Sequence, residues 1–208
     1  MNIKNHLKTV FADDDRPEKE MEKMVALMEL FYRLPEPPDP LGTHPSYKSL
    51  KEKFKIAIKS TSTSKNKSID SEFIETAFLN LYCNIHGNEA PYTSQERIRV
   101  NKTGGYWCHA GGISPLIKAY PWISKNTVSA DFGAGNGLQG LLLQWLYPHK
   151  KTVQIEISSK MIESGKELQK WLAIPKSKIQ WISDDIMNHS PNKYDFIYLY
   201  RPLKPEAL

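Results

Sequence analysis

Apolar residues recur at helical spacing in the first part of the chain. This pattern predicts three amphipathic helices, over residues 15–34, 46–60 and 71–86. At the start of the first, Asp15 is placed to cap the helix, and Pro17 suits its first turn. In the second, lysines occupy the face that the apolar residues leave. A contact with phosphate or acidic lipid would use such a face, but no aromatic side chain lies between the lysines, which favours a solvated surface.

The pattern changes after residue 120, where short apolar runs alternate with helical segments. The runs predict four strands, at 128–131, 152–157, 178–182 and 194–200. The segments at 137–147 and 158–172 predict helices between them. Strands and helices that alternate in this way form parallel strands joined by crossovers. We therefore expect an α/β protein with a doubly wound, mostly parallel sheet over residues 121–208 and a helical layer over residues 1–120.

Composition excludes several classes of protein. The 208 residues are 40% hydrophobic and carry a net charge of +5, enough apolar content for a core and no strong indication of nucleic-acid binding. No apolar run is long enough to span a membrane, and two cysteines build no disulfide framework, so a cytoplasmic location is expected. Two Cys–His pairs, Cys83 with His86 and Cys108 with His109, lack the usual spacing of zinc ligands. We expect no metal site.

A glycine-rich segment follows the first predicted strand. Gly133, Gly135 and Gly137 allow a tight turn and let a ligand approach the backbone. With Gly140, the segment also contains G-x-G-x-x-G, the pattern of dinucleotide-binding proteins, so an NAD-dependent oxidoreductase is one hypothesis. Asp131, however, lies two residues before the first of these glycines. A carboxylate there would repel a pyrophosphate and favours a sulfonium or ammonium ligand.

Carboxylates also follow the next two predicted strands. Glu156 lies at the end of the second, where an acid in such a fold accepts the hydroxyls of a ribose. After the third come Asp184, Asp185 and Ile186. We expect Asp185 to accept the exocyclic amine of adenine and Ile186 to pack on the ring, although Asp184 is able to exchange roles with Asp185.

Four segments in order resemble the class I S-adenosylmethionine-dependent methyltransferases, which have a Rossmann-like fold. They are Asp-Phe-Gly-Ala-Gly-Asn-Gly at 131–137, Gln-Ile-Glu-Ile-Ser-Ser-Lys-Met-Ile at 154–162, Ser-Asp-Asp-Ile at 183–186 and Tyr-Asp-Phe-Ile-Tyr-Leu-Tyr at 194–200. The resemblance covers roughly residues 125–203. It implies S-adenosyl-L-methionine as cofactor and transfer of a methyl group to an acceptor, a small molecule or a protein, that the sequence does not identify.

The resemblance assigns expected roles residue by residue. The loop from Asp131 to Gly137, including Ala134, would hold the methionine part of the cofactor. Glu156 would contact the ribose, and Asp185 with Ile186 the adenine. Ile157 and Asp184 are further expected cofactor-binding residues, Asp184 as the alternative to Asp185.

The substrate side is less defined. Tyr200 and Arg201, after the fourth predicted strand, are the candidate catalytic residues, able to orient an anionic or carbonyl-bearing substrate. A loop dense in glycine and aromatic residues precedes the first strand, and the resemblance makes it a candidate lid with Tyr106 and His109 as site residues.

The family's sheet has seven strands, and this sequence contains the pattern for four. We expect either a fragment of a longer enzyme, a domain completed by a partner chain, or a gap covered by the N-terminal helices; the first is favoured. The fourth strand would then form an open edge, through which self-association is possible. A non-catalytic cofactor-binding or interaction module is the alternative function.

Overall fold

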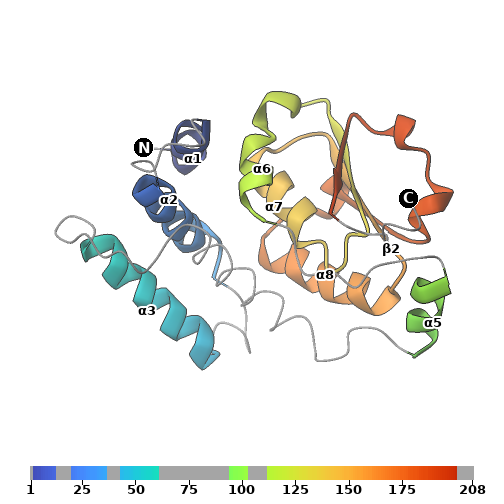
Figure 1. The fold of residues 1–208 in the computed structure, drawn as a ribbon, viewed down its shortest axis with the longest axis horizontal. Coiled ribbons are helices and arrows are strands. Elements are labelled where there is room, and N and C mark those ends of the chain that lie inside the picture. The colour runs from blue at the N-terminus through green and yellow to red at the C-terminus, as the bar shows by residue number, and fades with distance from the viewer. Residues whose placement is uncertain (1, 13–19, 37–42, 61–93, 103–111, 201–208) are drawn as a thin grey trace. The chain divides into compact units, whose positions relative to one another are not determined.

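Four parallel strands form the centre of the part of the chain that follows residue 120. In the computed structural model, residues 2–12, 20–36, 43–60, 94–102 and 112–200 are described. The strands are β1 Val128–Phe132, β2 Lys151–Glu156, β3 Ile179–Ser183 and β4 Phe196–Leu199. They lie in the order β3-β2-β1-β4 and every pair is parallel. Figure 1 draws the described residues as a coloured ribbon and labels β2 in this sheet. The predicted α/β, Rossmann-like fold with a parallel sheet is confirmed.

Two helices connect the first three strands. α7 (Leu138–Leu146) joins β1 to β2, and α8 (Ser159–Trp171) joins β2 to β3. Ser158 caps α8, because its hydroxyl accepts a hydrogen bond from the N–H of Met161 at 3.3 Å. From β3 to β4 the chain forms short 3₁₀ turns, η4 Ile186–Asn188 and η5 Pro191–Lys193, and a similar turn, η3 Lys176–Lys178, precedes β3.

The two faces of the sheet differ in character. On one face, Ala130, Phe132, Val153 and Ile155 form a buried apolar cluster, against which Ile186 and other half-buried residues pack. The opposite face lies beneath α7 and α8 and carries polar side chains that are nevertheless buried. These are Ser129, Asp131, Thr152, Gln154 and Glu156. The polar residues of β1 and β2 therefore face helices and not solvent.

The chain divides into two compact units. One comprises Met1–Tyr82 with Gly112–Tyr120, and the other comprises Cys83–Gly111 with Pro121–Leu208. The described helices of the first unit are α1 Ile3–Ala12, α2 Glu20–Arg33, α3 Pro45–Ser60 and α6 Ser114–Lys118. The second unit contains the sheet and α5 (Ser94–Lys102). The turn η2 (Tyr120–Trp122) includes the last residue of the first unit and the first residues of the following segment of the second. The predicted domains, 1–120 and 121–208, stay a prediction.

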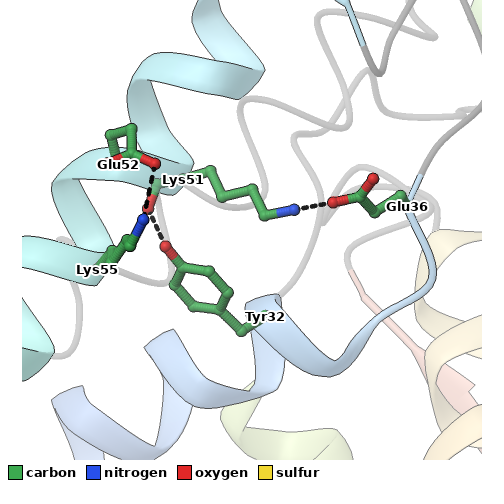
Figure 2. A network of polar contacts seen from close by, with 5 residues as sticks. All are labelled: Tyr32, Glu36, Lys51, Glu52 and Lys55. Atoms are coloured by element: carbon green, nitrogen blue, oxygen red, sulfur yellow. Dashed lines mark hydrogen bonds and ion pairs between the residues drawn. The ribbon is translucent and has the colours of Figure 1, made fainter.

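Helices α2 and α3 are joined by aromatic packing and polar contacts. Phe31 of α2 packs edge-on against Phe54 of α3, with ring centroids 5.2 Å apart. Figure 2 shows the polar side of this contact, where the hydroxyl of Tyr32 donates to the carbonyl of Lys51. The ammonium of Lys51 pairs with Glu36, and this hydrogen bond raises the pKa of Lys51. These contacts fix the two helices against each other.

The helical predictions are confirmed in part. α3 matches the predicted helix over 46–60, and α2 matches the later part of the predicted 15–34 helix. The proposed start of that helix at Asp15 and Pro17, and the predicted helix over 71–86, lie outside the described residues. The sequence pattern did not predict α1, α5 or α6. Within the described ranges, no helix combines the length and the apolar character needed to cross a membrane.

Candidate functional site

The glycine loop between β1 and α7 has an unusual backbone. Gly133, Gly135 and Gly137 have φ angles of 75°, 56° and 72°, a region that residues with a Cβ adopt rarely. The N–H groups of Gly133 and Ala134 both donate to the carbonyl of Ile155, each at 3.0 Å. The loop is thereby attached to the carboxyl end of β2. In open α/β sheets, ligands bind at the carboxyl ends of the strands.

Glu156, at the end of β2, is held by the same loop. Its Oε2 accepts from the N–H of Gly135 at 2.7 Å, and its Oε1 accepts from the N–H of Ser158 at 2.9 Å. The side chain is 3% exposed. Burial raises the pKa of Glu156, while the hydrogen bonds from Ser158 and Gly135 act in the opposite direction. Sequence reasoning placed this carboxylate at the end of the second strand but did not foresee that the glycine loop binds it.

Asp131 lies beneath the first turn of α7. Its Oδ2 accepts from the N–H of Gly140 at 3.1 Å, and the residue is 4% exposed. Burial raises the pKa of Asp131 from 3.8 to about 7, against the opposing effect of the Gly140 hydrogen bond. Asp131 is therefore buried beneath α7, and the ligand contact expected of its carboxylate stays a prediction.

The acids after β3 divide into two roles. Asp184 accepts from the side chain of Asn188 at 2.9 Å and lies 3.2 Å from Nε2 of His189. The hydrogen bond from Asn188 is the main reason that the pKa of Asp184 is lowered. Asp185 accepts from the N–H of Met187 at 3.0 Å and so caps η4. Since Asp184 is occupied by these contacts, Asp185 is the better candidate to meet a ligand.

The backbone connects this region to Glu156. The N–H of Asp184 donates to the carbonyl of Glu156 at 3.1 Å. Ile186 is half-buried against the apolar cluster, and Ile157 is half-buried beside Glu156. The structure thus brings together the predicted residues of the glycine loop, β2 and the turn after β3.

The candidate residues for the substrate side are less well placed. Tyr200 follows β4 and is 42% exposed. Arg201 and the candidate lid residues Tyr106 and His109 lie outside the described residues. The Cys–His pairs considered for zinc lie there too, and the described part of the chain contains no group of three or more His, Cys, Asp or Glu arranged to hold a metal ion.

Sequence reasoning missed two residues that shape the loop. Asn136 accepts from the N–H of Leu138 at 3.2 Å and so occupies a donor at the start of α7. Gln154 of β2 is fully buried, and its Nε2 donates to the carbonyl of Gly137 at 3.2 Å. In the sequence, Gln154 is a polar residue in an alternating strand, a pattern that normally indicates a side chain facing solvent. No signal in the sequence distinguished it.

A buried serine and histidine form a second polar group on this face of the sheet. Ser129 Oγ lies 2.8 Å from Nε2 of His149, and Nδ1 of His149 lies 2.6 Å from the carbonyl of Tyr147, which places the ring proton on Nδ1. The hydroxyl of Thr152 lies 2.9 Å from the same Nε2. Ser129 is 0% and His149 1% exposed. Ser129 lies on β1 and Thr152 on β2, so these buried contacts link the two strands.

Comparisons with known proteins add little to this geometry. No family model matches the chain, and no curated protein matches it. Among solved structures, a SAM-dependent methyltransferase from Thiobacillus denitrificans, in complex with S-adenosyl-L-homocysteine, aligns with a TM-score of 0.32 and 13% identity. The alignment covers 55% of this chain and 39% of that chain. A similarity this slight does not bear on the function, which must be argued from the site itself.

Proposed function

We propose that this chain is an S-adenosyl-L-methionine-dependent methyltransferase, or the cofactor-binding part of one. The observation that carries the proposal is how the N–H groups of the glycine loop and of the first turn of α7 are used. Gly135 donates to Glu156, Gly140 to Asp131 and Leu138 to the side chain of Asn136. In dinucleotide-binding proteins the pyrophosphate lies at the corresponding helix N-terminus. Here side-chain oxygens, two of them from carboxyl groups, occupy donors that a pyrophosphate would use.

This arrangement favours a positively charged nucleoside over a dinucleotide. When ionised, the two buried acids next to the loop would repel phosphates and attract a sulfonium. The third glycine of the G-x-G-x-x-G pattern has a packing role that either class of ligand would permit. A Cβ built at Gly140 would lie 2.4 Å from Nε2 of Gln154, so a larger residue there would displace the Gln154 amide from its contact with Gly137. The pattern alone therefore does not support NAD.

The proposal assigns the three parts of the cofactor to different residues. The loop with Gly133, Ala134, Gly135 and Gly137 would receive the methionine part, Glu156 and Ile157 the ribose, and Asp185 with Ile186 the adenine. Glu156 already accepts from Gly135, so ribose hydroxyls would compete for the carboxylate with that N–H. We therefore expect the loop to adjust at Gly135 when the ligand binds.

The sulfonium cofactor supplies an activated methyl group, and the protein's contribution is to align the acceptor with it. Orientation of this kind is worth roughly 7–11 kcal/mol of a reaction barrier. A general base is needed only where the acceptor must first lose a proton. Tyr200 and Arg201 are our candidates for orienting the acceptor, a small molecule or a protein. A cytoplasmic location belongs to the same proposal.

The test is cofactor binding by variants of Glu156. We expect Glu156→Ala to abolish the binding of S-adenosyl-L-methionine measured by isothermal titration calorimetry, because both the ribose contact and the anchor of Gly135 are lost. Glu167→Ala is the matched control, since Glu167 pairs with Lys170 on the exposed side of α8. Thermal unfolding of each variant verifies that it is folded.

Two results would contradict the proposal. One is unchanged affinity in the folded Glu156→Ala variant. The other is thermal stabilisation of the unaltered chain by NAD and not by S-adenosyl-L-homocysteine, which would select the oxidoreductase.

A further inference from the structure

One buried acceptor beneath the glycine loop lacks a hydrogen-bond donor among the described residues. Gln154 is 0% exposed, and its Nε2 donates to the carbonyl of Gly137, but its Oε1 receives no hydrogen bond there. The orientation of the amide is set by Gly137, because exchanging the two atoms would place two oxygens against each other. A buried acceptor left in this state is costly.

A buried carboxyl group lies next to it, and no cationic group among the described residues contributes to its electrostatics. Asp131 is opposite Gln154 in the register of β1 and β2, so both side chains lie on the face beneath α7. The side chains of Asp131 and Gln154 both lie close to Gly140. Its N–H donates to Asp131 Oδ2 at 3.1 Å, and the position of a Cβ at Gly140 is 2.9 Å from Oε1 of Gln154.

The charges around Asp131 do not favour its ionised form. Among the described residues, the charge that acts on it is that of Glu156 of β2, which is itself acidic and raises the pKa of Asp131. On the other side Tyr198 of β4 is its register partner, and α7 presents the N–H of Gly140. Gln154, an amide, is the remaining neighbour in the register. A single proton on Asp131 would remove the buried charge and provide the donor that Gln154 Oε1 lacks.

We propose that Asp131 carries a proton, donated to Oε1 of Gln154, when no cation occupies the site, and that the sulfonium cofactor displaces this proton whereas its neutral thioether product does not. The inference rests on the proposed function and deepens it, because it assigns to Asp131 the discrimination between cofactor and product. The displaced proton is released to solvent, so the net charge of the buried site changes little when the cation enters. The thioether brings no charge, and Asp131 keeps its proton.

The test compares S-adenosyl-L-methionine with S-adenosyl-L-homocysteine on the full chain. Calorimetric titrations at about pH 6, in two buffers of different ionisation enthalpy, measure the protons released on binding. We expect close to one proton per sulfonium ligand and none per thioether. The Kd of the sulfonium ligand should weaken by about tenfold per pH unit below neutrality, and that of the thioether should stay constant.

Two variants locate the effect. Asp131→Asn should bind both ligands without proton release and with no pH dependence of either Kd. Asp195→Asn is the matched control, because Asp195 also accepts a backbone N–H, from Val128 at 2.8 Å, but does so at the exposed start of β1. It should behave as the unaltered chain does.

Infrared spectroscopy tests separately whether Gln154 accepts the hydrogen bond from Asp131. Infrared difference spectra between the unaltered chain and Asp131→Asn at about pH 5 should contain the carbonyl band of a protonated carboxylic acid. In Gln154→Met this band should move to higher frequency, because the acceptor of the acid's hydrogen bond is gone. An unmoved band would overturn the assignment to Gln154.

The outcomes separate this inference from the proposed function. Binding of both ligands with equal or no proton release would overturn the inference and leave the proposed function in place. Failure of both ligands to bind would overturn the two together.

Discussion

At the scale of single residues, the two buried carboxyl groups of the site differ in the hydrogen bonds they receive. Glu156 accepts N–H groups from Gly135 and Ser158, one on each oxygen, whereas Asp131 accepts from Gly140. Burial raises the pKa of both, and that of Asp131 reaches about 7. Asp131 is therefore the group whose ionisation acts against the folded state in the neutral range.

Asp131→Asn should stabilise the protein at alkaline pH. The folded pKa of Asp131, about 7, is above the ordinary value of 3.8, so stability falls as the pH rises from about 4 to about 7. The difference between these two pKa values corresponds to on the order of 4 kcal/mol in the free energy of unfolding, which is an upper limit for the stability that the variant gains. Asparagine keeps the oxygen that Gly140 needs and has no charge. Urea unfolding should show the variant more stable than the unaltered chain at about pH 8, with the gain fading towards about pH 4.

The same measurement on Asp195→Asn distinguishes this effect from a general change in charge. Asp195 is exposed, so removing its charge should give no comparable gain at alkaline pH. A change in stability for Asp131→Asn that is the same at acid and alkaline pH would contradict the assignment.

The sequence allowed some of these residues to be predicted and concealed others for a physical reason. The positions of Asp131 and Glu156 follow from the chain order, because acids at strand ends lie at one edge of a parallel sheet. Gln154 and Ser129 could not be predicted as buried, because polar residues in an alternating strand normally face water. In the folded structure α7 and α8 cover this face of the sheet, so these polar side chains are buried, and the strand's own pattern does not contain that information.

At the scale of elements, glycines control how closely the helices approach the sheet. Gly165 of α8 lies against Trp181 of β3 and the backbone of the glycine loop. A Cβ at this position would be 2.3 Å from the Trp181 ring and 2.6 Å from the carbonyl oxygen of Asn136. The ring is itself fixed, since Nε1 of Trp181 donates to the side chain of Gln169 at 2.9 Å. The contact leaves no space for a methyl group.

Gly165→Ala should therefore destabilise the protein, although helix propensity alone predicts the opposite. Alanine in the middle of a helix is favoured over glycine by about 1 kcal/mol. Overpacking against a fixed ring and a backbone carbonyl costs about 1–3 kcal/mol and should outweigh that preference. Lys166→Ala, at the next and exposed position of α8, is the control and should change stability by less than about 0.5 kcal/mol. An increase in the melting temperature of Gly165→Ala would show that α8 moves away from the sheet at little cost.

Elements were easier to predict than the packing between them. The predicted strands and the helices α7 and α8 are confirmed, since each combines an apolar pattern with turn residues at its ends. α1 was missed although Ile3, Leu7, Val10 and Phe11 form its buried side. At ten residues α1 is short for an isolated helix, and its stability comes from contact with α2 and α6, which a local pattern does not contain.

At the scale of the whole molecule, buried groups at opposite ends of one sheet respond to pH in opposite directions. Asp131 lies towards the carboxyl ends of β1 and β2, and the hydrogen bonds of His149 reach their amino-terminal parts through Ser129 and Thr152. Burial lowers the pKa of His149 below its ordinary 6.5, so its contribution to stability is lost as the pH falls through 6.5. Ionisation of Asp131 removes stability as the pH rises. Below about pH 6.5 both groups affect the free energy of unfolding, and their contributions to its pH dependence have opposite signs.

Single and double variants should separate these two slopes. Relative to the unaltered chain, Asp131→Asn should make stability rise with pH, and His149→Gln should make it fall, each by up to about 1.4 kcal/mol per pH unit just below pH 6.5. The double variant should regain the slope of the unaltered chain at a different absolute stability, because the two groups do not share hydrogen-bond partners. Urea unfolding at several pH values measures all four slopes, with His149→Asn in reserve should His149→Gln fail to fold. If the single variants keep the slope of the unaltered chain, neither buried group sets the pH dependence, and the sheet's stability must depend on its exposed charges.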